Sequence, residues 1–235
     1  MKILKNEIRE LVSQKVLVSI FYIGIIFLDA LGAILPKYLD RQITLFIPLP
    51  LICIIHLINA NKINKWFLLS LVFNFVGLYH FNHPYKEYNA IGIILHAIAF
   101  LIYFLILLKY YQIANIKRVL KFSFLIVILA AVPTIIYSEG MNEMHLFYET
   151  LFYAFSVTIF IFSASLLYSN NKTKANRFLL FSTISILISS YLQGYNLFME
   201  KTNLLEFLAI ILFNLTHYFM CWYLIEKSRK KVHDV

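Results

Sequence analysis

Charged residues are scarce in this chain. Asp, Glu, Lys and Arg make up only 14% of its 235 residues, whereas roughly 25% is usual for a soluble protein, and 61% of the residues are hydrophobic. This composition excludes a water-soluble globule. The polar stretches are also too short for a separate folded domain of about 50 residues. We therefore expect one membrane-embedded unit.

Cysteine is nearly absent as well. The two cysteines, Cys53 and Cys221, both lie in apolar runs, which argues against a disulfide framework, and zinc sites of the CxxC type are missing. We expect no metal ion and no cofactor. The net charge of +9 comes from basic residues in short segments between apolar runs. Because they do not form one contiguous basic face, we expect no binding of nucleic acid.

What the chain has in abundance is long apolar runs. Runs of 17 or more residues, broken by short polar clusters, predict helices that cross a bilayer. The predicted fold class is all-α, a polytopic transmembrane bundle of eight helices with antiparallel neighbours. The predicted helices cover residues 16–35, 43–59, 66–82, 90–109, 119–137, 146–168, 178–199 and 205–225.

The distribution of cations predicts the orientation of this bundle. Of the 21 Lys and Arg residues, 17 lie in the two terminal segments and in alternate connections, and four lie in the remaining connections. Since positively charged connections stay in the cytoplasm, both termini are predicted to be cytoplasmic. The abundance of Ile, Phe, Lys, Asn and Tyr is typical of an AT-rich genome and favours the cytoplasmic membrane of a bacterium as the location.

The ends of the chain differ from its centre. Residues 1–15 place apolar side chains on one helical face among charged neighbours, which predicts a cytoplasmic interfacial segment. Asp29 interrupts the following apolar run and argues against a cleaved signal peptide. We assign residues 16–225 to the transmembrane domain and residues 226–235 to a basic cytoplasmic tail. Within the second and fifth predicted helices, Pro48, Pro50 and Pro133 predict kinks.

Ionisable side chains within apolar runs are the candidate functional residues, because burying a charge in a bilayer is costly. Three such residues, Asp29, His96 and Glu149, fall in the predicted outer half. Two carboxyl groups and a histidine in a low-dielectric pocket could act as an acid and a base, so we take these three as candidate catalytic residues. The candidate substrate-binding residues are Asn74, Ser190, Gln193 and Asn196.

Each of these residues also has a purely structural interpretation. Glu149 is close enough to its helix end to reach lipid headgroups. His96 and Asn74 could be hydrogen-bonding partners between packed helices. His56 and His217 could meet as a pair toward the cytoplasmic side, although nothing in their spacing requires it. The five glycines in the predicted helices favour close helix packing over a pocket lining.

Several motifs give the chain a resemblance to a known family. Over most of residues 45–225 it resembles the YhhN family of eight-helix membrane proteins, which includes lysoplasmalogenases. The resemblance rests on a Pro-Leu-Pro run, a Phe-to-Gly segment, a Gly-to-Tyr spacing and two late motifs. These stand in this chain at residues 46–50 and 73–78, between Gly92 and Tyr103, and at residues 189–198 and 216–218.

The resemblance implies hydrolysis of the vinyl ether bond of a lysophospholipid. Such chemistry needs an acid to protonate the alkene carbon and water to trap the resulting cation. The chain departs from the family at four polar positions. Where the family has aspartates, this chain has Leu78 and Ser190, and Phe100 and Cys221 replace a histidine and a glutamine. The chain therefore resembles a divergent member of the family.

Three hypotheses remain open, with membrane lipids as partners in the first two. The first is a divergent lysoplasmalogenase with a lysophospholipid substrate, in which Asp29, His96 and Glu149 have taken over the acid-base chemistry. The second is a lipid-binding or amphiphile-binding membrane protein without catalysis. The third, a small transporter, is least favoured because the sequence shows no convincing internal repeat. Whether the chain is an enzyme, and its oligomeric state, stay open at this point.

Overall fold

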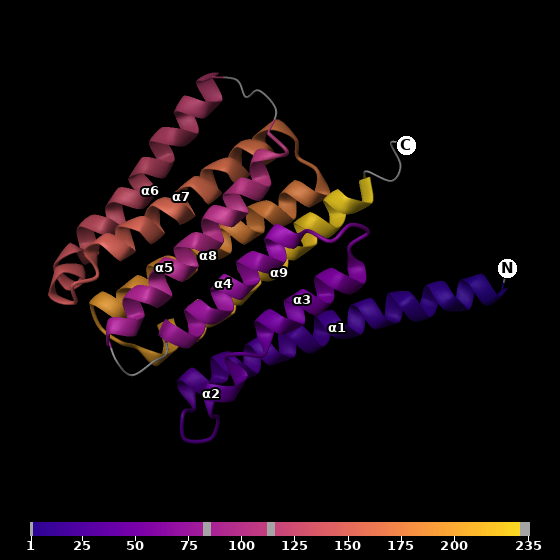
Figure 1. Cartoon of the computed structure of the whole chain (residues 1–235), viewed down its shortest axis with the longest axis horizontal. Helices are drawn as coiled ribbons and strands as arrows, with labels where there is room; N and C mark the ends of the chain where they lie inside the picture. The colour runs from indigo at the N-terminus through magenta and orange to yellow at the C-terminus, as the bar shows by residue number, and fades with distance from the viewer. Residues whose placement is uncertain (1, 82–85, 112–115, 231–235) are drawn as a thin grey trace.

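A computed structural model describes residues 2–81, 86–111 and 116–230 of the chain (Figure 1). Within these ranges every regular element is a helix. The elements are α1 (Lys2–Ile34), α2 (Arg41–Thr44), α3 (Pro48–Asn59), α4 (Lys65–Phe81), α5 (Lys86–Leu108), α6 (Ile116–Glu143), α7 (Phe147–Asn170), α8 (Lys174–Phe198) and α9 (Asn203–Lys230).

The all-helical prediction is confirmed, and each predicted apolar run coincides with a long helix or, in one case, with the pair α2 and α3. Among the described residues, six segments are long and apolar enough to cross a membrane, and α4 is a shorter apolar helix. The six are Val16–Ile34, Arg41–Asn59, Tyr88–Leu108, Phe147–Asn170, Lys174–Phe198 and Asn203–Arg229. The molecule is thus an apolar helical bundle of the kind that integral membrane proteins form. The count of eight crossings and their orientation stay predictions.

The second predicted helix is not one continuous helix. The single-turn helix α2 ends at Thr44, and α3 begins only at Pro48. The expected kink at Pro48 and Pro50 is therefore wrong. Both residues lie in the first turn of α3, where a backbone N–H would have no acceptor within the helix, so a proline there removes no helical hydrogen bond. Pro133 does lie inside α6, as predicted.

The ends of the chain continue the outermost helices. Helix α1 runs without a break for 33 residues, about 50 Å, so residues 2–15 extend the first predicted crossing. The side chains of the predicted interfacial segment, residues 1–15, lie outside the part that the structure describes. At the other end α9 continues to Lys230 and includes the first half of the predicted tail, whereas residues 231–235 lie outside the described residues.

The connection between α7 and α8 shows how local sequence ends one helix and starts the next. The Thr173 side chain accepts a hydrogen bond from the backbone N–H of Asn176 at 3.2 Å and caps α8. The Asn176 amide nitrogen in turn donates to the carbonyl oxygens of Leu167 and Asn171 at 2.9 and 2.7 Å. These two carbonyls also accept the backbone N–H groups of Asn171 and Thr173, respectively, so the Asn176 amide gives each of them a second donor.

Helices that pack together are mostly, but not always, neighbours in sequence. The most extensive pairings join α8 to α9 and α4 to α5, and α5 packs on α7. Helix α1 packs on α9 and α3, and α6 packs on α7 and α8 (Figure 1). Helix α1 starts, and α9 finishes, at the same end of the bundle. We call this end the basic end, and the end that holds α2 and the α8–α9 connection the acidic end.

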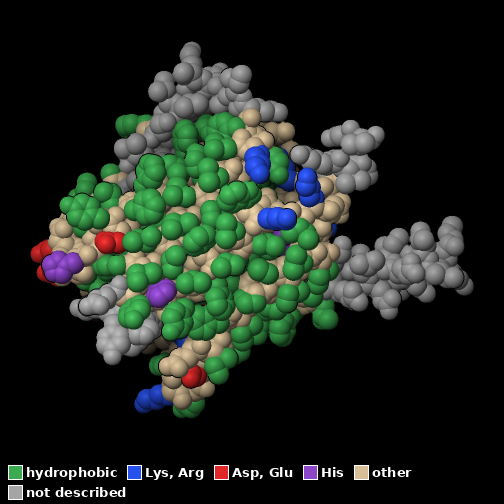
Figure 2. All heavy atoms as spheres, in the orientation of Figure 1, with side chains coloured by type: hydrophobic (Ala, Val, Ile, Leu, Met, Phe, Trp, Pro, Cys, Tyr) green, Lys and Arg blue, Asp and Glu red, His purple; other side chains and the backbone are tan. Residues whose placement is uncertain are grey.

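The names reflect how charge is distributed (Figure 2). Most of the described Lys and Arg residues gather at the basic end, where they flank the α3–α4 and α7–α8 connections and the last turns of α9, whereas Lys37, Arg41 and Lys201 lie at the acidic end. The acidic end carries most of the carboxylates, namely Asp29, Asp40, Glu139, Glu143, Glu149, Glu200 and Glu206. The predicted orientation, in which the basic end faces the cytoplasm, depends on this asymmetry and stays a prediction.

The half of the bundle nearest the basic end is filled by aromatic side chains. Phe67, Phe100, Tyr103, Phe160 and Tyr223 are fully buried there. The Tyr103 ring centroid lies 5.5 Å from that of Phe160 and 5.9 Å from that of Phe67. These separations are typical of favourable aromatic pairs, so the core of this half is dense. An apolar groove of about 460 Å³ between α1 and α9 lies on the outside of this core and is open to the surface.

Candidate functional site

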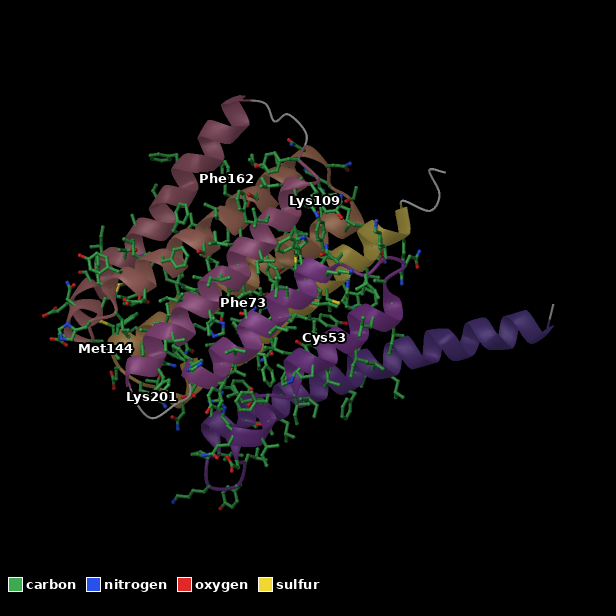
Figure 3. The ribbon with its side chains drawn as sticks, in the orientation of Figure 1. Cys53, Phe73, Lys109, Met144, Phe162 and Lys201 are labelled. Atoms are coloured by element: carbon green, nitrogen blue, oxygen red, sulfur yellow. The ribbon has the colours of Figure 1, made fainter. Side chains whose placement is uncertain are left out.

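The half of the bundle nearest the acidic end is hollow. A cavity of about 420 Å³ lies between α1, α2, α4, α5, α7, α8 and α9. Its volume falls within the range of about 300 to 1,000 Å³ that ligand pockets commonly have. Its lining mixes apolar side chains with Asp29, Arg41, His96, Gln193, Lys201 and Glu206. Lys201 lies at the acidic end and Lys109 toward the opposite end (Figure 3).

Four charged side chains form one network in the cavity wall. Arg41 Nε lies 3.4 Å from Asp29 Oδ1, and Arg41 Nη1 donates to Glu206 Oε1. Lys201 Nζ lies 3.4 Å from Glu206 Oε2. The hydroxyl of Thr44 also donates to Asp29 Oδ1, at 3.0 Å. Two cations thus balance two carboxylates, and the wall as a whole is electrically neutral.

A glycine on α1 makes room for Arg41. A Cβ atom at Gly32 would lie 2.4 Å from Arg41 Cγ and 3.1 Å from its Cδ. Any larger residue would therefore push the arginine side chain away from α1. Helix α2, although only four residues long, thereby carries its arginine across α1 to both Asp29 and Glu206.

His96 faces the same cavity from α5 and is held from behind by α4. Its Nδ1 lies 2.8 Å from Asn74 Oδ1. The Asn74 amide nitrogen donates to the carbonyl oxygen of Ser70 at 3.1 Å, so the amide oxygen is the atom that faces His96. A neutral ring then carries its hydrogen on Nδ1 and leaves Nε2 as an acceptor. Gly77 lets the ring approach α4, because a Cβ there would lie 3.0 to 3.2 Å from ring atoms.

Helix α8 contributes the polar face opposite α1. Ser190 Oγ and the Tyr153 hydroxyl share a hydrogen bond of 2.9 Å, and both residues line the cavity. Gln193 is one turn further along α8 and also lines it. Asn196 Oδ1 accepts from the backbone N–H of Thr202 at 3.0 Å and thereby fixes the α8–α9 connection at the mouth.

The structure brings together most of the residues that the sequence singled out. Asp29 and His96 of the catalytic set, and Ser190, Gln193 and Asn196 of the binding set, line the one cavity. Asn74 lies behind His96 and positions it. Glu149 is not part of the lining; it lies in the first turn of α7, where a carboxylate is stabilised by the helix dipole.

Several lining residues escaped the sequence analysis. Arg41 and Lys201 were assigned to polar connections, and Glu206 lies just inside the last helix. The role of Arg41 depends on α2 folding back over α1, which no periodicity predicts, whereas Lys201 and Glu206 pair with each other near the start of α9. Tyr153 was hidden among many aromatic residues. One sequence feature pointed to Arg41 and Lys201: the predicted outer connections hold only four cations, and these are two of them.

The other buried histidines do not form the pair that the sequence left open. His56 Nε2 accepts a hydrogen bond from the backbone N–H of Asn64 at 3.1 Å. His217 Nδ1 lies 2.8 Å from the Tyr103 hydroxyl, inside the aromatic core. Phe213 packs between His217 and the cavity residue His96. Its ring centroid lies 4.6 Å from that of His217 and 5.4 Å from that of His96.

The arrangement can hold a ligand with polar groups and can present a histidine and a carboxylate to it. Within the described ranges, no cluster of three or more His, Cys, Asp or Glu side chains could bind a metal ion. Comparison of the chain with protein-family models, with curated proteins and with solved structures gives no match. The functional argument therefore depends on the cavity itself.

Proposed function

We propose that this chain is an integral membrane protein that binds an amphiphile, with the polar part of the ligand in the cavity near the acidic end. The observation that carries the proposal is the cavity of about 420 Å³ with a neutral network of four charges in its wall. Buried charges are costly in a bilayer and are usually retained for function. A polar headgroup would give these charges further partners, while an apolar tail stays among lipids.

The resemblance to the YhhN family supports this location. Leu78 and Ser190 occupy the positions where that family has aspartates, and both line the cavity. Phe100 and Cys221, at the other two departures, are fully buried in the packed core instead. If the resemblance holds, the cavity lies where that family carries two of its acids. Replacement of those acids favours binding over hydrolysis in this chain.

Native mass spectrometry of the purified chain tests the proposal, with a single-chain phospholipid as the probe. We expect wild-type protein to retain the probe. Gln193→Trp, which fills the cavity, should lose it. Ile184→Trp, on the exposed face of the same helix, should retain it. Equal retention by both variants would place the probe outside the cavity and would contradict the proposal.

A lysoplasmalogenase-like hydrolase is the second candidate, supported by the presence of His96 and Asp29 in one cavity. Its weakness is that Glu149, the third proposed catalytic residue, lies outside the lining, and that Asp29 is paired with Arg41. Release of aldehyde from a lysoplasmalogen by purified protein, lost in His96→Ala, would favour this candidate. Absence of release under conditions where a YhhN enzyme is active would eliminate it.

The bacterial cytoplasmic membrane and a cytoplasmic position for the basic end belong to the same proposal. They are supported by the positive charge gathered at the end where α1 starts and α9 finishes. In this orientation the cavity opens toward the outer side of the membrane.

A further inference from the structure

A second, smaller hollow adjoins the cavity. It has a volume of about 80 Å³ and lies between α6, α7 and α8, and we call it the α6 pocket. Helix α6, which forms its outer wall, lies at the edge of the bundle (Figure 1). Five residues line both hollows, namely Thr150, Tyr153, Ser190, Gly194 and Phe198. No more than one layer of side chains therefore separates the α6 pocket from the cavity.

The lining of the α6 pocket is mostly apolar and elongated. On α7 the lining residues follow one helical face from Thr150 to Ile161, over a rise of about 16 Å. On α6 the facing wall is formed by Pro133, Tyr137 and Met141, which recur every fourth residue. A volume of about 80 Å³ along such a stripe is a narrow slot. Its shape suits an unbranched hydrocarbon chain and not a fused ring system.

Close contacts hold α6 against α8 near the acidic end. A Cβ atom at Gly194 would lie 2.8 Å from the Tyr137 ring, and a Cβ at Gly140 would overlap the backbone oxygen of Phe198. The Tyr137 hydroxyl also donates to the backbone oxygen of Tyr191 at 3.0 Å. A larger residue at either glycine would push the two helices apart. A chain in the α6 pocket therefore extends away from the acidic end, toward the middle of the bundle.

The layer between the two hollows is thinnest at Ser190. Gly194 has no side chain, but the Tyr137 ring already covers it. Ser190 has the next smallest side chain of the five shared residues, and its hydroxyl shares a hydrogen bond of 2.9 Å with that of Tyr153. This bond joins α8 to α7 across the layer. A chain that leaves the cavity for the α6 pocket would pass beside this pair.

The apolar groove between α1 and α9 is larger than the α6 pocket but is not continuous with the cavity. Among the described residues, none that lines the groove also lines the cavity. Tyr22, which is fully buried, lies between them. Its hydroxyl donates to the backbone oxygen of the cavity residue Asn214 at 2.9 Å, and its ring stacks on that of the groove residue Tyr218 at 5.3 Å. A ligand in the cavity therefore meets packed side chains in this direction.

Resting on the proposed function, we infer that the α6 pocket is the subsite for the hydrocarbon chain of the ligand, which leaves the cavity beside Ser190. The ligand is then an amphiphile whose chain is unbranched next to its polar part. Because the α6 pocket is small, it holds only this first part of the chain. The rest of the chain stays among lipids.

Filling each apolar site in turn tests the inference. Ala154 lines the α6 pocket, whereas Ser19 lines the groove between α1 and α9. A single-chain phosphocholine is titrated against the full-length protein in a steroid-based detergent, whose fused rings do not fit the narrow slot, with native mass spectrometry as the readout. Ala154→Phe should weaken binding about tenfold, because it displaces methylene groups from the pocket. Ser19→Phe should leave the affinity unchanged.

Equal affinities of Ala154→Phe and wild type, or of the two variants, would overturn the inference. The proposed function would remain intact as long as wild-type protein retains the probe. If wild-type protein retains no probe, both the inference and the proposed function are overturned.

A second measurement uses wild-type protein alone and so does not depend on how the variants fold. The probe is a single-chain phosphocholine with a photoreactive group in its acyl chain, close to the headgroup. We expect crosslinks between Pro133 and Met141 of α6 and between Thr150 and Ile161 of α7. Crosslinks confined to residues between Val16 and Ile23 of α1 would place the chain in the groove and would overturn the inference.

Discussion

The two halves of the bundle use the same helices and similar residue types, yet the core of one half is filled and the core of the other contains a cavity. His217 and His96 show the contrast, because both are buried and both pack against Phe213. His217 is surrounded by aromatic rings and bonds to Tyr103. His96 bonds to Asn74 on one side and faces a cavity on the other. A buried histidine is therefore a candidate ligand-binding residue only where packing leaves space beside it.

Ion pairs at the two ends teach the same lesson. At the basic end, Lys174 Nζ lies 3.1 Å from Glu226, but the lysine side chain is 64% exposed. At the acidic end, Arg41 joins a carboxylate that is 1% exposed to one that is 18% exposed. An exposed pair contributes little to stability, whereas the loss of one partner from a buried pair leaves a charge without compensation. Burial of the ion pair, more than the distance between its charged atoms, decides how much the loss of one partner destabilises the protein.

Truncation of a buried ring in the aromatic core nearest the basic end is expected to lower stability more than any other change considered. Phe160→Ala should lower the free energy of unfolding by about 3 kcal/mol or more, because a void replaces a fully buried ring. Phe198→Ala, at the wall of the existing cavity, should cost clearly less. Thermal unfolding in detergent, followed by size-exclusion chromatography, compares the two variants. Equal losses would mean that the two halves are packed alike.

The next largest effect concerns Arg41. Arg41→Met removes the cation shared by Asp29 and Glu206 and should lower stability by about 2 kcal/mol. Adding Asp29→Asn should recover part of that loss, since one unpaired charge disappears. As the matched change at the basic end, Lys174→Met should cost less than about 0.5 kcal/mol. A similar cost for both single variants would contradict the contrast between the two ends.

A smaller effect is expected for the hydrogen bond in the aromatic core. Tyr103→Phe leaves His217 Nδ1 without its partner and should cost about 1 kcal/mol in unfolding free energy. Binding of a single-chain lipid should not change, because neither residue lines the cavity. Loss of binding in Tyr103→Phe with unchanged stability would link the core to the site and would contradict their separation.

The smallest change is a single methyl group at a glycine. Gly77→Ala should displace the His96 ring by a few tenths of an ångström and weaken lipid binding with less than about 1 kcal/mol lost in stability. Gly24→Ala is the control, because a Cβ at Gly24 meets nothing within 4 Å. Stability and binding are measured for both variants. Unaltered binding in Gly77→Ala would mean that the position of His96 does not matter for the ligand.

The apolar runs predicted the helices well, because any long segment without charges must satisfy its backbone internally in a membrane. They failed at Pro48, where the pattern of hydrophobic residues continues across a break in the backbone. Hydropathy reports how apolar a segment is. It does not distinguish one continuous helix from two helices that a short turn separates.

The candidate site was partly predictable. Asp29, His96 and Gln193 stood out because polar groups are conspicuous among apolar residues, and all three line the cavity. Glu149 stood out for the same reason, yet it lies in a helix's first turn outside the lining. Arg41 and Glu206 lie in the lining because α2 folds back toward α1 and α9, and such a tertiary contact between distant segments leaves no pattern in the sequence.

The most direct test of the account is to map where a ligand lies. A single-chain phospholipid with a photoreactive headgroup, crosslinked to the purified protein and located by mass spectrometry, reports the residues beside it. We predict crosslinks to residues of the cavity wall, between Ser189 and Phe198 of α8 and between Glu206 and Asn214 of α9. Crosslinks confined to the exposed faces of α1 and α6 would show that the cavity is not the binding site.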